Sequence, residues 1–252
     1  MNKILAFSFV FIFAVTCSGQ TNAPWAEPKP QDYPKLKKLG ERVSNFLPNG
    51  FEIVKSVSGD LNGDRIPDIA VHIIGTSKKF LYKNDGLGSD IHDTNPRMLL
   101  ILFKKKSGGY TLAEQNNNFV IAPMSPVSTE PFQTMSIKNG VLRVEFELWQ
   151  SAGSWGATNA TYKFKFINSK FILIGVDRQD YMRNDSTYET HSFNFLTKKL
   201  KITTGVRSEL DEEDPARRTK PMIVWKSFKA KRRSLASHGP AFGWEIEPDI
   251  SI

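Results

Sequence analysis

Cysteine is almost absent from this chain of 252 residues, which contains only Cys17. One cysteine excludes a disulfide framework and any zinc or iron–sulfur site built from several cysteines. Histidine is also scarce, and its four copies are too scattered along the chain to indicate a histidine-rich metal centre. No apolar run reaches the roughly 20 residues that a membrane-spanning helix requires. With 40% hydrophobic and 24% charged residues, the composition is that of a folded globular protein.

The first 23 residues follow the order of regions found in a secretory signal peptide. Lys3 supplies a positive charge, Ile4–Val15 is apolar, and small and polar residues follow. We therefore predict a signal peptide over residues 1–23 and a secreted protein located in the periplasm or at the outer envelope. Two outcomes for Cys17 stay open. It is either acylated, so that a lipid anchor is the protein's membrane contact, or removed with the signal peptide.

Three further regions follow the signal peptide. Residues 24–35 contain four prolines and are predicted to be a linker. Residues 36–205 form the expected β domain, and residues 206–252 form a charged C-terminal extension that packs partly on the sheet. At the start of the β domain, apolar residues at helical spacing predict a short N-terminal helix over 36–47. The apolar residues of this stripe are Leu36, Leu39, Val43, Phe46 and Leu47.

From residue 51 onward, short apolar or alternating runs separated by turn signals predict an all-β fold of mostly antiparallel sheets. Asn139-Gly140 is the strongest hairpin signal. Only one Asp-rich loop is present, whereas a propeller needs typically four to eight similar blades, so we expect a sandwich or a partial-propeller-like arrangement. The expected strands are Phe51–Val57, Ile69–Gly75, Met98–Phe103, Tyr110–Ala113, Phe119–Ala122, Phe132–Lys138, Val141–Leu148, Thr161–Phe166, Phe171–Asp177, Tyr188–Phe195, Lys199–Thr203 and Pro221–Trp225.

Residues 60–68 carry the one pattern with metal chemistry. Side-chain oxygens stand at loop positions one, three, five and nine, and a backbone carbonyl is available at position seven. Calcium takes six to eight hard oxygen ligands, which such a loop and one or two waters supply. Three crowded carboxylates without a cation disfavour each other's ionisation. We therefore predict a structural calcium site. Its protein ligands are Asp60, Asn62, Asp64 and Asp68 through their side chains and Ile66 through its carbonyl.

The loop differs from an EF-hand in two respects. Position twelve is Val71, where an EF-hand requires a bidentate Glu. The residues after the loop are β-branched and apolar, which predicts a strand in place of a helix. The alternative to a metal site is an Asx-rich hairpin turn that binds no ion.

The runs Gly59–Asp64 and Pro67–Ala70 resemble the calcium loop of FG-GAP (VCBS-type) repeats. Over residues 36–233, the order of motifs is similar to a group of secreted or lipidated bacterial proteins with a single such loop, whose function is largely uncharacterised. The resemblance implies that the loop joins two antiparallel strands. It implies an all-β fold and an envelope location, and no particular activity. Arg65 stands where the family usually has Gly at positive φ, which would weaken calcium binding. Many members carry a cysteine pair that this chain lacks.

A few other residues are candidates for binding or catalysis, and each has a simpler structural interpretation. Trp149 and Trp155 lie among small residues between two strands, where they form either a stacking platform for a sugar ring or peptide, or a cover for the core. Ser154 misses the Gly-x-Ser-x-Gly spacing of a nucleophile elbow. Glu145 and Glu147 share one face of a strand and do not face each other across a cleft. No catalytic residue is predicted.

The leading functional hypothesis is a non-catalytic binding or envelope-associated module that contacts a protein or glycan of the cell envelope. One alternative is a hydrolase of an envelope polymer whose site the sequence does not display. Another is an inhibitor or immunity-type partner of a toxin. The formal net charge is +8. The basic run Lys226–Arg233 could contact an anionic surface, but the nearby acidic cluster Glu209–Asp214 favours self-compensation. Nucleic acid is not an expected partner of a secreted chain.

Overall fold

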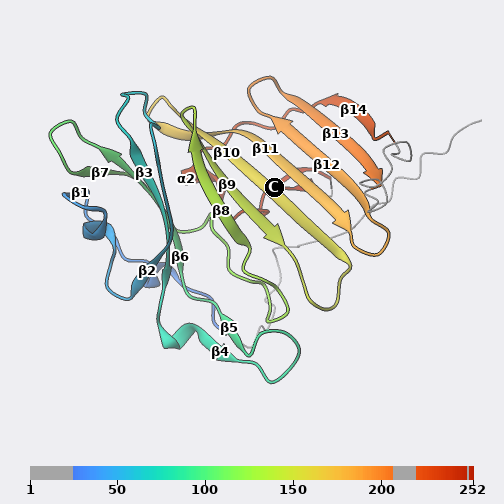
Figure 1. The fold of residues 1–252 in the computed structure, drawn as a ribbon, viewed down its shortest axis with the longest axis horizontal. Coiled ribbons are helices and arrows are strands. Elements are labelled where there is room, and N and C mark those ends of the chain that lie inside the picture. Colours follow the sequence, from blue (N-terminus) through green and yellow to red (C-terminus); the bar gives the residue numbers. More distant parts are fainter. Residues whose placement is uncertain (1–24, 207–219, 249) are drawn as a thin grey trace, which may run out of the picture.

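The computed structural model describes residues 25–206, 220–248 and 250–252 (Figure 1). All strand pairs among these residues are antiparallel, which confirms the predicted class of mostly antiparallel β protein. The described strands form open sheets, and no propeller closes among them. No helix in this part of the chain has the length and apolarity needed to cross a bilayer. The predicted signal peptide with Cys17 and the acidic cluster Glu209–Asp214 lie outside the described residues.

The larger sheet has seven strands, and each strand pairs with its neighbours along the chain. The first hairpin turns at Asn139 and Gly140, both at positive φ (54° and 71°), as the two-residue turn predicts. Alternation along β9 places Leu142, Val144 and Phe146 in the core. The strands are β8 (Phe132–Lys138), β9 (Val141–Leu148), β10 (Gly156–Ile167), β11 (Lys170–Met182), β12 (Thr187–Asn194), β13 (Lys199–Val206) and β14 (Met222–Ser227).

The second sheet has five strands in the order β1-β7-β6-β3-β2, with the small hairpin β4–β5 inserted between β3 and β6. The 3₁₀ helix η1 (Pro30–Asp32) precedes β1, η2 (Val43–Phe46) lies between β1 and β2, and η3 (Lys78–Phe80) follows β3. The strands are β1 (Leu39–Gly40), β2 (Phe51–Gly59), β3 (Asp68–Gly75), β4 (Leu81–Lys83), β5 (Ile91–Asp93), β6 (Arg97–Lys104) and β7 (Tyr110–Asn116).

The two sheets meet where β2 lies beside β8, and they share one core (Figure 1). A Cβ on Gly59 of β2 would lie 2.5 Å from Ile137 Cγ2 of β8, so only glycine allows this close approach. The shared core contains Ala70 and Ile101 from the smaller sheet. Alternate residues of β3 and β6 pack instead against Phe46 on the opposite face. Both strands are therefore buried on two sides, which explains their nearly continuous apolar sequences.

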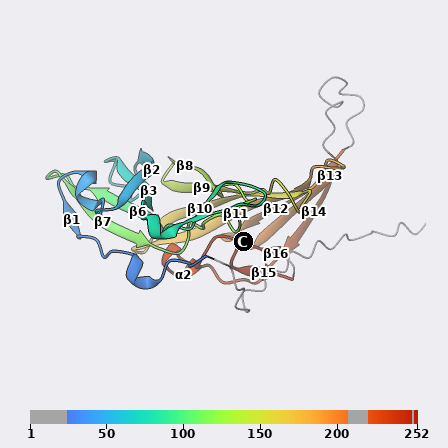
Figure 2. The ribbon, with the colours of Figure 1, turned by 90° about the horizontal axis from the view of Figure 1, so that it is seen from below.

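The C-terminal segment covers one face of the seven-stranded sheet (Figure 2). It contains α2 (Leu235–His238), β15 (Glu245–Glu247) and β16 (Ile250–Ser251). The Tyr162 hydroxyl accepts a hydrogen bond from the backbone N–H of Phe242 at 2.8 Å, which anchors the segment to β10. The buried apolar residues of the segment are Phe228, Leu235, Ala241, Trp244 and Ile252.

The predicted N-terminal helix over 36–47 is wrong. This segment forms β1, which pairs with the edge of β7, and then the 3₁₀ helix η2. The Asn45 Oδ1 accepts hydrogen bonds from two preceding backbone N–H groups, at 3.0 and 2.9 Å, and so closes a tight local turn. A Cβ on Gly40 would lie 2.8 Å from the ring of Phe46, because the chain folds back on itself here. The one α-helix among the described residues is α2, near the C-terminus.

The apolar stripe predicted for that helix is nevertheless mostly used for burial. Phe46 is 1% exposed, and Leu36, Val43 and Leu47 pack against the same cluster. Leu39 is 59% exposed, because it lies in the two-residue strand β1 at the edge of the sheet. The predicted helix and the observed structure, a short strand followed by a 3₁₀ helix, therefore turn most of the same residues toward the core.

One other segment differs from its sequence prediction. Phe119–Ala122 was expected to be a strand, but it is a loop after β7. The Asn116 Oδ1 accepts hydrogen bonds from the N–H groups of Asn118 and Phe119, which ends the strand, and the Phe119 side chain then fills the core. The Pro-rich segment contacts the hairpin β4–β5, since the Thr94 hydroxyl donates to the Ala26 carbonyl at 3.0 Å.

Candidate functional site

The loop between β2 and β3 is wrapped around its own side-chain oxygens. Every backbone N–H from Leu61 to Ile66 donates to an oxygen of Asp60, Asn62, Asp64 or Asp68, at 2.7–3.3 Å. Short polar side chains form such Asx-type bonds readily. The loop therefore holds the four predicted side-chain ligands by hydrogen bonds from the backbone, but its three carboxylates are not grouped closely enough to hold a metal by themselves.

Asp68 is the buried anchor of this loop. Its Oδ2 accepts from the N–H groups of Leu61 and Asn62, and its Oδ1 accepts from the N–H of Lys104 at the end of β6. The side chain lies at 0% exposure. Burial raises the pKa of this carboxyl group, while the three backbone hydrogen bonds oppose the shift. A nearby cation would favour the charged form further.

Two residues of the loop have left-handed backbone conformations. Gly63 has φ 85° and Arg65 has φ 66°. The positive φ expected at Arg65 from the family pattern is confirmed. A non-glycine residue in this region costs roughly 1–2 kcal/mol, so the loop stores strain at Arg65. No atom lies within 4 Å of a Cβ built on Gly63, so there is room for a side chain here. The positive φ is therefore what favours glycine at this position.

The donor set of the loop fits calcium chemically. It consists of carboxylate and carboxamide oxygens, with no nitrogen or sulfur ligand. An ionised carboxylate has about four acceptor positions. Asp60 uses two of them for backbone N–H groups. Asp64 also uses two, for the Ile66 N–H and the Asn62 side-chain amide, so lone pairs remain for a cation. Within the described residues, no three His, Cys, Asp or Glu side chains are grouped closely enough to hold a metal by themselves. The Asn62 oxygen, the Ile66 carbonyl and water would therefore be needed as well.

A second candidate site is a groove of about 690 Å³ formed by three loops and lined by both polar and apolar residues. The loops are 88–93 in the hairpin β4–β5, 123–130 before β8, and 149–151 after β9. Backbone hydrogen bonds join them, because Ser89 N–H donates to the Pro126 carbonyl and Ser151 N–H donates to the Val127 carbonyl, each at 2.9 Å. The lining is rich in hydroxyl groups, from Ser89, Ser125, Ser128, Thr129 and Ser151.

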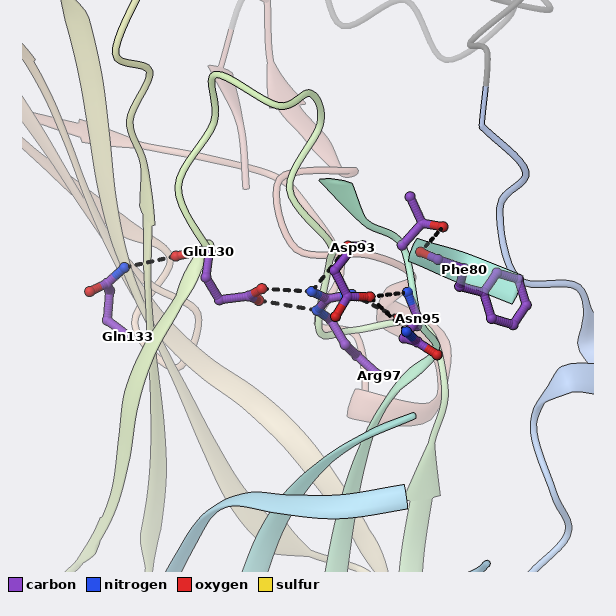
Figure 3. A network of polar contacts seen from close by, with 7 residues as sticks. Phe80, Asp93, Asn95, Arg97, Glu130 and Gln133 are labelled. Atoms are coloured by element: carbon purple, nitrogen blue, oxygen red, sulfur yellow. Dashed lines mark hydrogen bonds and ion pairs between the residues drawn. The ribbon is translucent and has the colours of Figure 1, made fainter. Parts of the chain in front are cut away.

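An ion pair joins Glu130, an exposed residue of the groove lining, to the buried Arg97 (Figure 3). The guanidinium of Arg97 is 2% exposed, and its Nε and Nη2 donate to the two carboxylate oxygens of Glu130 at 3.1 and 2.6 Å. Arg97 Nη1 also donates to the Asn95 carbonyl at 2.7 Å. Asp93 Oδ1 accepts from the backbone and side-chain amides of Asn95. Both groove carboxylates, Asp93 and Glu130, are therefore engaged by internal donors.

His92 lines the same groove. The side chain is 2% exposed, its ring centroid lies 4.3 Å from that of Trp25, and its Nε2 has no hydrogen-bond partner. Burial, followed by the positive charge of Arg97, lowers the pKa of this imidazole. The groove thus presents an indole from Trp149 and several hydroxyl groups, while His92 lies buried beside them.

Trp149 and Trp155, the predicted stacking pair, are brought together by Arg183. The guanidinium lies 4.8 Å from the Trp149 ring centroid and 5.9 Å from that of Trp155. It also donates to the backbone carbonyls of Gln150, Ser154 and Trp155. Trp149 lines the groove, whereas Trp155 is 64% exposed and is absent from its lining. The two indoles therefore do not form one flat platform.

Ser154 and Glu147, for which the sequence predicts no catalytic role, do not form a catalytic group in the structure. Ser154 Oγ bonds to the backbone of Gly156. Glu147 accepts a hydrogen bond from the Tyr181 hydroxyl at 3.2 Å. His72 and His238 lie in the core, and their ring nitrogens have no hydrogen-bond partners.

Sequence reasoning missed the groove and Arg183, because residues from three distant loops build the groove and no local motif marks any of them. The closest local signals were the Pro-rich, Ser-rich run before β8 and the two tryptophans. Comparison with family models, with curated proteins and with solved structures found no match for this chain.

Proposed function

We propose that this chain is a secreted, non-catalytic β protein of the bacterial cell envelope. Calcium would staple its loop at 60–68, and the groove beside Trp149 would bind a protein or glycan of the envelope. The proposal separates a structural role for the loop from a recognition role for the groove.

The observation that carries the calcium role is the continuous set of hydrogen bonds from the N–H groups of residues 61–66 to the loop oxygens. These bonds hold three carboxylates and one carboxamide in a single short loop. Asp68 then links the loop to β6 through Lys104. A cation that neutralises these carboxylates would stabilise the connection of three strands, and extracellular calcium sites bind with Kd of about 10⁻⁴–10⁻³ M.

The groove supports binding better than hydrolysis. A carboxylate pair in catalysis needs one group free to donate or accept a proton at the substrate. Here Glu130 holds the guanidinium of Arg97 with both oxygens, and Asp93 accepts from the two amide groups of Asn95 with Oδ1 alone, so the groove offers at most one partly free carboxylate and no free pair. An indole beside several hydroxyl groups is instead suited to contact a sugar ring or a peptide through packing and hydrogen bonds.

The calcium role is tested by thermal melting of the purified protein in excess chelator, in 10 mM calcium and in 10 mM magnesium. At this concentration a site with Kd of 10⁻⁴–10⁻³ M adds roughly 1.5–3 kcal/mol to the free energy of unfolding. That corresponds to a rise in Tm of about 5 °C for a chain of this size. The Asp64→Ala variant should lose the rise. An equal rise in magnesium, or in the variant, would contradict the calcium staple.

The binding role is tested by co-sedimentation with purified peptidoglycan and with an envelope protein fraction. Trp149→Ala should reduce the bound fraction at least fivefold. Leu87→Ala is the matched control. Leu87 is an exposed apolar residue of the hairpin β4–β5, and it does not line the groove. If both variants bind like the original chain, the groove is not the recognition site.

A further inference from the structure

The outer edge of the seven-stranded sheet is formed by β14, whose six residues are all exposed (Figure 1). Four consecutive residues of this strand are large and apolar. Their exposed fractions are 62% for Met222, 49% for Ile223, 38% for Val224 and 63% for Trp225. No other run of four exposed large apolar residues occurs in the described parts of the chain.

The apolar side chains of β14 point to both faces of the sheet. Val224 pairs with Ile202 and lies on the face that carries the core. Trp225 pairs with Lys201 and lies on the opposite face. A strand that is apolar on both faces is normally found inside a sheet that is covered on both sides. Here the sequence of an interior strand stands at an exposed edge, which indicates that another strand covers it.

The backbone of β14 is also suited to accept a further strand. Its pairing with β13 runs without a bulge from Ser227 to Met222. The other edges are protected in ways that native sheets commonly use. β1 has only two residues, β2 contains a bulge between Ile53 and Lys55, and β8 lies beside β2. An edge strand presents a row of unpaired N–H and C=O groups, and β14 offers them along its whole length.

The charges around β14 indicate the character of the covering strand. Three exposed cations lie in the strand or within two residues of its ends, and none of them forms an ion pair with a described residue. They are Lys220, Lys226 and Lys229. A strand with an apolar centre and acidic ends would match both the side chains and these charges, and it would compete for them with the chain's own acidic cluster Glu209–Asp214.

A second copy of the chain fits this edge poorly. If two β14 strands paired antiparallel about Val224 and Trp225, Lys220 of one copy and Lys229 of the other, which flank the strand, would be brought toward each other at both ends of the pair. Repulsion between like charges disfavours this arrangement. An anionic membrane would attract the cations, but an open sheet edge cannot enter hydrocarbon without leaving its N–H and C=O groups unsatisfied.

We propose that β14 is a docking edge to which a partner protein adds an extended segment as an eighth strand, with an apolar centre and acidic ends. The affinity comes from backbone hydrogen bonds and from side chains packed on alternate faces. This surface is separate from the calcium loop and from the groove, so the inference stands or falls independently of their roles.

The test uses the purified protein, expressed from the full-length chain, and fluorescent nine-residue peptides. The first peptide has a Val-Thr-Val-Thr-Val centre and two Glu residues at each end. The second has Lys in place of Glu. The third keeps the Glu residues but carries a methyl group on every backbone nitrogen of the centre, so that it cannot donate to a strand. Fluorescence anisotropy should show that the first peptide binds at least tenfold more tightly than the other two.

The protein variants locate the binding. Ile223→Thr combined with Trp225→Thr keeps residues that favour strands but removes the apolar surface on the face opposite the core. It should weaken binding of the first peptide at least tenfold and leave Tm nearly unchanged. Leu196→Thr is the control, since Leu196 is 54% exposed in the turn after β12. It should change the affinity by less than twofold.

Several results would overturn the proposal. The first is no binding of the Glu peptide, or equal binding of the methylated peptide. The second is a dimer in sedimentation equilibrium that the double variant abolishes, which would assign β14 to a second copy. The third is flotation with vesicles of anionic phospholipid that the double variant abolishes, which would assign the strand to a membrane surface.

Discussion

The carboxylate of Asp68, the first residue of β3, accepts a hydrogen bond from the backbone N–H of Lys104, the last residue of β6, across 3.0 Å. The same carboxylate accepts from Leu61 and Asn62 in the loop that precedes β3. One buried side chain therefore fixes the Asp-rich loop against the end of a neighbouring strand. Loop conformation and sheet register are coupled at this point.

Replacing Asp68 should destabilise the protein even without calcium. Asp68→Ala leaves three backbone N–H groups near a buried position without their acceptor, at a cost of roughly 1–3 kcal/mol for each group that water cannot reach. Asp68→Asn keeps one acceptor oxygen and should cost less. Chemical denaturation in excess chelator measures both changes. Equal stability of the original chain and Asp68→Ala would show that these hydrogen bonds contribute nothing.

Arg65→Gly should relieve strain in the loop. Glycine adopts φ near 66° freely, and the gain is partly offset by its greater freedom in the unfolded chain. We expect up to about 1 kcal/mol of added stability and tighter calcium binding. Ser169→Gly is the control, because Ser169 has φ 61° in the hairpin between β10 and β11. It should give a similar gain in thermal melting with no change in calcium affinity by calorimetry.

Stability should fall as the pH drops below 6.5, because two core histidines must gain a charge there. Burial lowers the pKa of His72 to about 3 and that of His238 to about 4. Since each folded pKa lies below the unfolded value, their contribution is complete above pH 6.5. It is lost progressively as the pH falls toward the folded pKa.

Each of these histidines should cost about 1.4 kcal/mol per pH unit over that window. Urea denaturation at pH 7.5 and pH 4.5 measures the loss. His238→Leu should retain more of its pH 7.5 stability at pH 4.5 than the original chain does. A variant that loses stability with the same pH slope as the original chain would rule out His238 as a cause.

Breaking the ion pair between Glu130 and Arg97 should be costly. Glu130→Gln leaves the guanidinium of Arg97, which is 2% exposed, without its counter-charge. Removing one partner of a buried pair typically costs 3–5 kcal/mol, and the partial exposure of Glu130 should reduce this to about 2 kcal/mol. A double-mutant cycle with Arg97→Met measures the coupling. A coupling energy near zero would mean that the pair does not stabilise the groove.

The β strands were predictable where side-chain alternation and turn chemistry agree. The bounds of β8 and β9 match the expected ones, since Asn139-Gly140 fixes their turn and the buried residues alternate along β9. The helix expected at 36–47 failed because apolar spacing alone does not distinguish a helix from a chain that turns over a core. Its actual form depends on contacts of Gly40 and Asn45 that only the folded chain reveals.

The candidate loop was predictable from the sequence, whereas the groove was not. The loop could be found in the sequence because its ligands stand within nine consecutive residues. Its positive φ at Arg65 followed from the family pattern. The groove could not be found, since Asp93, Glu130 and Trp149 come from three separate connections. Their proximity depends on how both sheets pack, and no local pattern encodes that packing.

The strand order of the two sheets has a consequence for how the chain folds. In the seven-stranded sheet each strand meets its predecessor, so the hairpins at Asn139 and Asn168 can close early and extend by local zipping. The five-stranded sheet pairs Leu39 with Thr111, so a long loop must close before these strands make contact. Closing that loop costs conformational entropy. We expect the seven-stranded sheet to form first and the five-stranded sheet to be completed late, at the rate-limiting step of folding.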